Sequence, residues 1–322
     1  MNLISNLKRF SLIAFFGLMT LSCSDDDEND SPENSLLVEA QSQTSLSTFV
    51  DALERAGLDG IFGSDTVMSV FAPTNTAFST FLTENGYATL EQVPVDVLRE
   101  LLLNHTLDGS IETSELFTGY RKTLARGMAS ETNYLDMYVD TSNGINLNGM
   151  ANITTPNIAT SNGMIHIVDH VIELPTVLSV VKANSELSTL KSALAYNPAS
   201  GFEALLDGTG SDAPFTLFAP TDAAFASYFT ETGQTVLAGY PEQDLETTLQ
   251  FHIGTGSNSL SSGFFDNQSF PTLSNQFFTI NLTGGGKKIT DPQDRVSTMT
   301  KTDIQASNGV VHLIDKVLMP NL

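Results

Sequence analysis

Two patterns of apolar residues recur along this chain, and each occurs twice. Residues 67–73 (VMSVFAP) and 214–220 (PFTLFAP) are short apolar runs ending at a proline, which indicates a strand end because proline cannot donate to a sheet ladder. Apolar side chains then follow at helical spacing, namely Phe78, Phe81 and Leu82 in one copy and Phe225, Tyr228 and Phe229 in the other. This stripe predicts a helix packed in the core, with Thr74 or Asn75 as its N-cap.

A second helix is expected over residues 94–105 (PVDVLRELLLNH). Pro94 suits a helix start, and Leu98, Leu101, Leu102 and Leu103 give the helix an apolar face. The helix leads into a short segment, HTLDG, which Gly109 closes.

Asn-Gly pairs predict β-hairpins, because both residues tolerate the backbone of a tight turn. Asn143-Gly144 separates YLDMYVD from INLNG, and Asn162-Gly163 precedes a long run rich in Ile and Val. Each half of the chain is therefore β-rich, with several helices in its first part. We expect an α+β fold, a β-sandwich wedge with packed helices.

The two halves repeat one another in order. Phe71-Ala-Pro-Thr returns as Phe218-Ala-Pro-Thr, 147 positions later, and Pro94, Leu98, Leu102, His105 and Gly109 return at the same offset. NIATSNGMIHIVDHVIELP (157–175) matches DIQASNGVVHLIDKVLMPN (303–321) at an offset of 146. Such agreement across unlike motifs predicts two tandem domains of one fold, at 40–175 and 176–322.

The N-terminus has the pattern of an export signal. Lys8 and Arg9 precede a 12-residue apolar run, Phe10 to Leu21, which is too short to cross a bilayer as a helix. The run ends at Ser22-Cys23, and Cys23 is the only cysteine of the chain. This arrangement resembles a bacterial lipoprotein, with residues 1–22 as the signal peptide and Cys23 as the lipidation site. The alternative is an ordinary secretory peptide followed by an incidental cysteine.

An acidic segment follows the cysteine. The stretch SDDDENDSPENS contains six acidic and no apolar residues, so we expect residues 23–39 to form a solvated tether. It serves either as a plain spacer or, by resemblance to surface lipoproteins of some Gram-negative bacteria, as a tag for surface export.

Charge limits the classes of partner. The chain has 37 acidic and 14 basic residues and a net charge of −23. It is repelled by phosphate backbones and by anionic lipids, so we expect no nucleic-acid partner and no membrane contact except through the N-terminal lipid.

The repeated motifs resemble the fasciclin domain. The segment FAPTNTAF, the helix ending in Asn104-His105, and SNGMIHIVDHVIELP are similar to its signature regions, and all occur twice. The resemblance implies two tandem fasciclin-like domains that act in extracellular adhesion and are not enzymes.

The resemblance also suggests residues that contact a partner. A Tyr-His pair near the second helix and an Asp-Ile pair are linked to receptor binding in animal members. Here the corresponding histidines are His105 and His252, without the tyrosine, and the Asp-Ile pair is intact only as Asp303-Ile304. The alternative for this pair is that Ile304 lies in the core and Asp303 caps a turn.

No pattern points to catalysis or to a metal or other cofactor. His166, Asp169 and His170 are the donor types of a metal site, but alternate strand residues face opposite sides and the second copy has Lys316 in place of His170. We expect His166 and His312 to be buried, hydrogen-bonded strand residues, with Asp169 and Asp315 bonded to the backbone nearby. GGGKK (284–288) lacks the spacing of a phosphate loop and predicts a hairpin tip.

Two functions follow from these observations. The first is a non-enzymatic adhesion or interaction lipoprotein, anchored to the bacterial outer membrane and exposed at the surface, that meets an extracellular protein or glycan. The second is a secreted module that binds a small ligand, either a sugar or a divalent cation. A concave, aromatic-lined pocket would favour the second function.

Overall fold

The computed structural model describes residues 34–322, so the expected signal peptide, Cys23 and the acidic run before residue 34 lie outside the described residues. The predicted tether extends too far at its C-terminal end. Helix α1 (Leu36–Ser42) begins inside the range assigned to it, Ser35 caps that helix, and Leu36 is buried. The reason is the apolar stretch that starts at Leu36, which gives the helix a face to bury.

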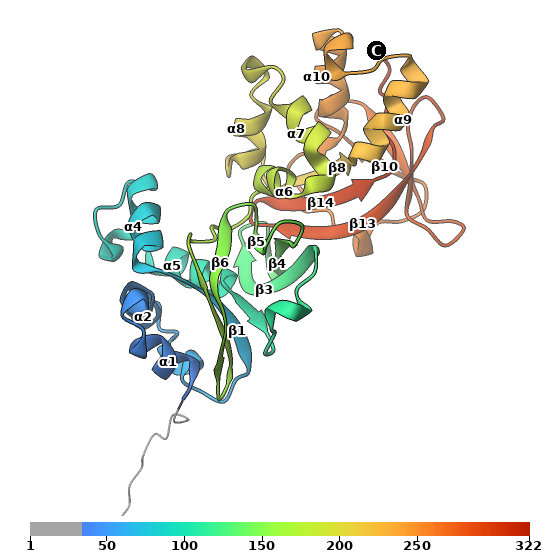
Figure 1. Ribbon diagram of the computed structural model, residues 1–322. Coiled ribbons are helices and arrows are strands. Elements are labelled where there is room, and N and C mark those ends of the chain that lie inside the picture. Colours follow the sequence, from blue (N-terminus) through green and yellow to red (C-terminus); the bar gives the residue numbers. More distant parts are fainter. Residues whose placement is uncertain (1–33) are drawn as a thin grey trace, which may run out of the picture. The chain divides into compact units, whose positions relative to one another are not determined.

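The first repeat contains a seven-stranded barrel with helices on one side (Figure 1). Its remaining helices are α2 (Ser47–Arg55), α3 (Asp59–Phe62), α4 (Asn75–Glu84) and α5 (Val95–Asn104). Its strands are β1 (Met68–Pro73), β2 (Thr106–Asp108), β3 (Gly119–Gly127), β4 (Ser130–Asp140), β5 (Asn146–Leu147), β6 (Ala151–Thr160) and β7 (Gly163–Val168).

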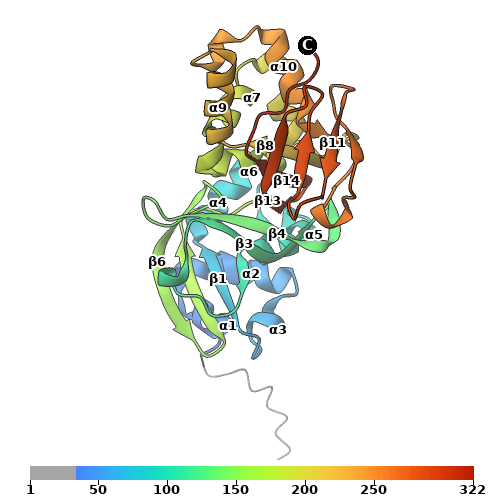
Figure 2. The same cartoon turned by 90° about the vertical axis from the view of Figure 1, so that its right-hand side faces the viewer.

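The second repeat has the same element order but an open sheet, in the order β10-β11-β12-β13-β14-β8-β9 (Figure 2). Its helices are α6 (Val177–Ala183), α7 (Ser188–Leu194), α8 (Phe202–Asp207), α9 (Asp222–Thr232) and α10 (Glu242–Phe251). Its strands are β8 (Phe215–Pro220), β9 (Ile253–Gly254), β10 (Gln268–Pro271), β11 (Phe277–Asn281), β12 (Lys288–Thr290), β13 (Val296–Ala306) and β14 (Gly309–Ile314).

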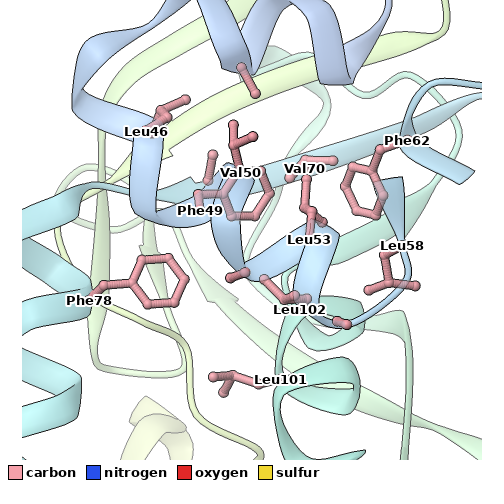
Figure 3. Close-up of a cluster of buried hydrophobic side chains, with 14 of the residues drawn as sticks. Leu46, Phe49, Val50, Leu53, Leu58, Phe62, Val70, Phe78, Leu101 and Leu102 are labelled. Atoms are coloured by element: carbon pink, nitrogen blue, oxygen red, sulfur yellow. The ribbon is translucent and has the colours of Figure 1, made fainter. Parts of the chain in front are cut away.

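The α+β prediction and both predicted helices are confirmed. Thr74 caps α4 by accepting a hydrogen bond from the Ala77 amide at 3.2 Å, and Thr221 caps α9 from the Ala224 amide at 3.3 Å. The predicted apolar stripe is core: Phe78, Phe81, Phe225 and Tyr228 are buried, and Leu82 and Phe229 pack against them. Figure 3 shows Phe78 with side chains of α2 and α5.

The predicted hairpins form as well. β4 pairs with β5 across the Asn143-Gly144 turn, β6 pairs with β7 across Asn162-Gly163, and β11 pairs with β12 around the GGGKK tip. A close backbone contact also explains why glycine occupies position 163 in the second turn. A Cβ at Gly163 would lie 1.8 Å from the Met68 carbonyl oxygen of β1, which runs parallel to β7, so no side chain fits there.

The asparagine of the same turn ties each repeat to its first helix. The Asn162 side chain accepts a hydrogen bond from the Leu36 amide at 2.7 Å and donates to the carbonyls of Phe62 and Ser64. Asn308 holds the start of α6 in the same way, accepting from the Val177 amide at 2.8 Å. Both side chains are buried, so this polar cross-link replaces water at the helix N-terminus.

Polar contacts also join the first repeat to the second within the described residues. The Asp136 carboxylate accepts hydrogen bonds from the backbone amide of Gln305 and from the Lys122 ammonium, both at 2.7 Å. Burial raises the pKa of Asp136, and the charge of Lys122 opposes that rise. A buried carboxylate of this kind is costly unless it is paired, so both hydrogen bonds are needed to hold it in place.

Candidate functional site

Asp303 lies at an irregularity of β13, where the register with β14 shifts between Lys301 and Ile304. Its backbone has a φ of 64°, and its counterpart on β6, Asn157, has a φ of 59°. This left-handed conformation is costly for most residues but tolerated by Asn and Asp. The local strand geometry therefore explains why one of these two residues occupies the position in both repeats.

The Asp303 side chain anchors the turn opposite it. One carboxylate oxygen accepts a hydrogen bond from the Ser261 amide at 2.6 Å, and the other accepts from the Ser261 hydroxyl. The Lys287 ammonium donates to the same hydroxyl at 2.7 Å. The carboxylate thus fixes the short 3₁₀ helix η7 (Ser261–Gly263), while 36 % of the Asp303 side chain stays exposed.

The ring of His312 is hydrogen-bonded to the backbone of Asp303. Its Nδ1 accepts a hydrogen bond from the Asp303 amide at 3.2 Å, and its Nε2 lies 3.0 Å from the Ser259 carbonyl oxygen. This pattern requires the neutral ring with the proton on Nε2. Burial lowers the pKa of His312 and therefore favours the neutral form.

The first repeat has the same device with an amide in place of the carboxylate. The side-chain oxygen of Asn157 accepts a hydrogen bond from the backbone amide of Thr113 at 2.9 Å. The backbone amide of Asn157 donates to His166 Nδ1 at 3.2 Å. His166 Nε2 lies 2.9 Å from the Ile111 carbonyl oxygen, and burial lowers the pKa of His166 too. Both histidines are fully buried, as predicted.

The charge of Asp303 distinguishes the two copies. Burial by itself raises the pKa of this carboxyl, but the hydrogen bonds from Ser261 outweigh it, and the pKa lies below its usual range. Asp303 is therefore ionised at neutral pH and gives the second repeat a fixed negative charge. At the matching position the first repeat carries the neutral side chain of Asn157.

The cluster of Ser261, His312 and Asp303 contains the residue types of a catalytic triad but not its geometry. The Ser261 hydroxyl donates to Asp303, and both ring nitrogens of His312 are bonded to backbone groups. No ring nitrogen is left to accept the serine proton, which nucleophilic activation requires. The arrangement orients a loop and does not activate Ser261.

The other candidate contact residues have buried side chains. Ile304 is 1 % exposed and packs in the core of the second repeat. His105 Nδ1 lies 2.8 Å from the Leu101 carbonyl oxygen, and its Nε2 accepts from the Ile172 amide at 2.8 Å. His252 makes the same two contacts, with the Thr248 carbonyl at 2.7 Å and the Leu318 amide at 2.9 Å.

These two histidines join the end of a helix to the final segment of each repeat. Burial lowers the pKa of both rings to about 4, so they are neutral at neutral pH. A partner could touch His105, His252 or Ile304 only after a local rearrangement, whereas the Asp303 side chain is partly exposed. Partner contact at all four positions stays a prediction, and the structure favours Asp303 among them.

An exposed aromatic side chain follows each anchored turn, and the sequence pattern does not reveal it. Phe117 is 63 % exposed and Phe265 is 62 % exposed, at equivalent places after the Asn157-anchored and Asp303-anchored turns. Each follows a buried neighbour, Leu116 or Phe264, so the pairs resemble an apolar core run. The only sequence signal is that an aromatic residue recurs at the same position of both repeats.

His166 has hydrogen-bond partners separate from those of Asp169 and His170. Asp169 accepts hydrogen bonds from the Asn152 amide at 2.7 Å and from His170, while His166 is bonded to Ile111. In the second repeat the Asp315 carboxylate accepts from the Thr298 amide at 2.6 Å. Within residues 34–322, no group of three or more His, Cys, Asp and Glu side chains is placed to hold a metal ion. No helix in the same range is long and apolar enough to cross a bilayer.

Comparisons with known proteins match both halves of the chain. A family model described as the fasciclin domain matches residues 44–175 and 185–320. The chain is 28 % identical over 263 residues to transforming growth factor-beta-induced protein ig-h3 of Sus scrofa, which covers 79 % of this chain and 35 % of that protein. It is 26 % identical over 254 residues to periostin of Homo sapiens, covering 78 % and 28 %. The chain thus spans about a third of the length of these animal relatives.

A bacterial relative and a solved structure extend the comparison. Protein sll1483 of Synechocystis sp. is 30 % identical over 145 residues, covering 45 % of this chain and 73 % of that protein. The solved structure is a FAS1 domain pair from the insect cell adhesion molecule fasciclin I, with a TM-score of 0.53 and 18 % identity, covering 85 % and 97 % of the two chains. At that identity the match supports the fold alone.

Proposed function

The chain belongs to the fasciclin-domain family, and we propose that it is a non-enzymatic adhesion or interaction lipoprotein. In this proposal its two domains meet a protein or glycan partner outside the cell. Cys23 carries the lipid and holds the protein at the outer membrane, with the domains exposed at the surface.

The observation that carries the proposal is the exposed phenylalanine on each anchored turn. Phe117 and Phe265 have rings that are more than half exposed, at equivalent sites of two domains whose surrounding residues differ, and the Arg121 guanidinium lies 3.6 Å from the centroid of the Phe117 ring. The turns are held by Asn157 and Asp303, so the rings are presented with little loss of loop freedom on binding. Aromatic side chains are enriched among residues that dominate binding energy at protein interfaces.

Binding to an immobilised panel of matrix proteins and glycans tests this proposal. Protein lacking residues 1–23 keeps the whole described region and is expected to bind at least one member of the panel. The double variant Phe117→Ser, Phe265→Ser should weaken that binding about tenfold or more, the usual effect of losing an aromatic anchor. Val296→Ser, at an exposed apolar residue outside these turns, is the matched control. Binding that both variants leave unchanged would contradict the proposed surface.

The lipid anchor has a separate test. Cells fed a clickable fatty acid should label the wild-type protein and should not label Cys23→Ser. Equal labelling of the two proteins would remove Cys23 from the proposal. Protease added to intact cells then tests surface exposure, because a periplasmic protein is protected from it.

A second candidate function, binding of a small sugar, is supported by one cavity of the second domain. The cavity has a volume of about 520 Å³ and is lined by amide and hydroxyl side chains, the carboxylates of Asp291 and Asp294, and the exposed ring of Phe277. Competition by free sugars, lost in Phe277→Ser, would favour this candidate. Panel binding that free sugars leave unchanged would favour the adhesion role.

A further inference from the structure

The tip of the β3–β4 hairpin reaches from the first domain to the second. The Ala129 amide donates a hydrogen bond to the Ser307 carbonyl at 2.8 Å. Gly127 lies so close to Ser307 that a Cβ on it would be 2.3 Å from the Ser307 Cα. The tip is therefore fixed by backbone contacts and cannot accept a side chain at position 127.

Two cavities adjoin this tip and share Met128 and Thr209 in their linings. The larger has a volume of about 520 Å³ and extends between α5 and the hairpin to Leu174 and Ser307. The smaller has a volume of about 140 Å³ and extends to Ala213 and Pro214. We call the two together the hairpin-tip groove.

The groove exposes apolar side chains. Met128 is 72 % exposed and Val97 is 44 % exposed, and the half-buried Leu174 lies with them in the larger cavity. Apolar surface rimmed by polar groups marks interaction sites on soluble proteins, and methionine adapts its shape to different apolar ligands. The fixed backbone around Met128 keeps most of this side chain exposed within the part of the chain that the structure describes.

The rim of the groove is acidic. The carboxylates of Asp96, Glu100 and Glu131 line it together with a single cation, Arg126. The Arg126 guanidinium lies 4.9 Å from the ring centroid of Tyr134 and donates a hydrogen bond to the Tyr134 hydroxyl. Arg126 is therefore already engaged by Tyr134. The Glu100 carboxylate accepts a hydrogen bond from the backbone amide of Arg126 at 2.6 Å, and this bond fixes the position of the carboxylate. The rim therefore attracts cations.

We infer that the hairpin-tip groove docks a segment of a partner protein in which apolar side chains are flanked by lysine or arginine. The apolar side chains enter the two cavities beside Met128, and the cations face Asp96, Glu100 and Glu131. In an extended segment alternate side chains point to the same side, so residues i and i+2 can enter both cavities. A second copy of this chain is disfavoured as the occupant by its net charge of −23.

This inference rests on the proposed interaction function and names a surface distinct from Phe117 and Phe265. It is tested with the synthetic peptide Lys-Lys-Leu-Ser-Leu-Lys-Lys, blocked at both ends, on protein lacking residues 1–23. Two control peptides replace all lysines by glutamate or both leucines by serine. Calorimetry gives the affinity, and amide chemical shifts locate the site.

We expect the lysine–leucine peptide to bind at least tenfold more tightly than either control peptide and to shift the amides of Val97, Met128 and Thr209. Met128→Ser should weaken binding about tenfold, because it removes an apolar side chain that the leucines of the peptide would bury. Met150→Ser changes an exposed methionine that lines neither cavity and should leave the affinity unchanged. Asp96→Asn with Glu131→Gln should weaken binding and reduce its dependence on salt.

Three outcomes would overturn the inference. The serine peptide could bind as tightly as the leucine peptide, which would mean attraction by charge alone. The wild-type protein could dimerise through the groove and lose the dimer in Met128→Ser, which would make a second copy the occupant. Finally, the peptide could fail to bind or to shift the groove amides while the panel binding that depends on Phe117 and Phe265 persists. In that last case the groove proposal fails and the proposed function stands.

Discussion

Each domain has a hydrophobic cluster around the phenylalanine of its Phe-Ala-Pro motif, and the side chains of this cluster differ between the two domains. In the second domain Phe218 contacts Phe264, Phe270 and Phe278, with ring centroids 5.0–6.3 Å apart. In the first domain Phe71 occupies the same place among leucine, isoleucine, valine and methionine side chains. The ring of each stacks on a histidine at 5.3 Å, His312 or His166. Both domains therefore keep the stacked histidine, but the apolar side chains packed around the phenylalanine differ.

The difference shows which parts of the fold depend on residue identity. An apolar volume can be filled by several combinations of side chains, provided the density is kept. A buried polar group must find its partner at a set distance, which restricts the choice of residue. This explains why His105 and His252 make matching hydrogen bonds while their neighbours, Asn104 and Phe251, differ.

The largest expected effect comes from removing the two central rings. Phe218→Ala and Phe71→Ala should each destabilise their domain by about 3–5 kcal/mol, with Phe218→Ala nearer the upper value because it also loses three aromatic contacts. Urea denaturation followed by NMR signals of each domain measures both. Equal losses would mean that the aromatic contacts add nothing to the buried area.

Acid should weaken both domains to the same extent. His105 and His252 take up a proton at pH 6.5 when unfolded but only near pH 4 when folded, because burial lowers their pKa. Their contribution is therefore fully present above pH 6.5 and is lost as the pH falls to 4, at about 3 kcal/mol per domain.

Two measurements check the acid effect. Histidine ring signals in NMR should show no titration of His105 and His252 between pH 8 and 5. The variant His105→Gln, His252→Gln should lose less stability than the wild type over the same acid range. Titration of either buried ring near pH 6.5 in the folded protein would contradict this account.

Replacing the turn asparagines should have an intermediate effect. Asn162→Ala and Asn308→Ala each remove three hydrogen bonds to the backbone, one at the start of the first helix and two near the end of the third, so we expect a loss of about 2–3 kcal/mol in either domain. Thermal unfolding measures the loss. Asn146→Ala is the control and should cost about 0.5 kcal/mol or less, because the side chain of Asn146 donates a hydrogen bond to the exposed side chain of Asn152. A loss confined to one domain would show that the two cross-links are not equivalent.

The smallest effect is expected where the domains differ in charge. Asp303→Asn gives the second domain the side chain that already anchors the turn in the first, so the change in stability should stay below about 1 kcal/mol. Asp303→Ala should cost more, since it loses both hydrogen bonds and places alanine at a φ of 64°. If the charge itself contacts a partner, Asp303→Asn weakens panel binding at unchanged stability. Unchanged binding would leave the turn anchor as the role of Asp303.

The sequence was sufficient to predict the repeat, the helix caps and the buried histidines, because each leaves a local pattern or returns at a fixed offset. It could not show that Phe117 and Phe265 face water, since exposure depends on which of two adjacent apolar residues the turn directs inward. It also could not show the hairpin-tip groove. That groove depends on contacts between residues nearly 180 positions apart, such as Ala129 and Ser307.

The state of the sheet edges limits how copies of this protein can associate. The barrel of the first domain has no free edge, and the open sheet of the second ends in β9 and β10, which are two and four residues long. Short edges give another strand little backbone to pair with, and Pro271 at the end of β10 has no N–H to donate. Copies of this protein are thus protected from joining sheet to sheet. Recognition is left to side chains, so a few surface substitutions can change the partner while the fold stays the same.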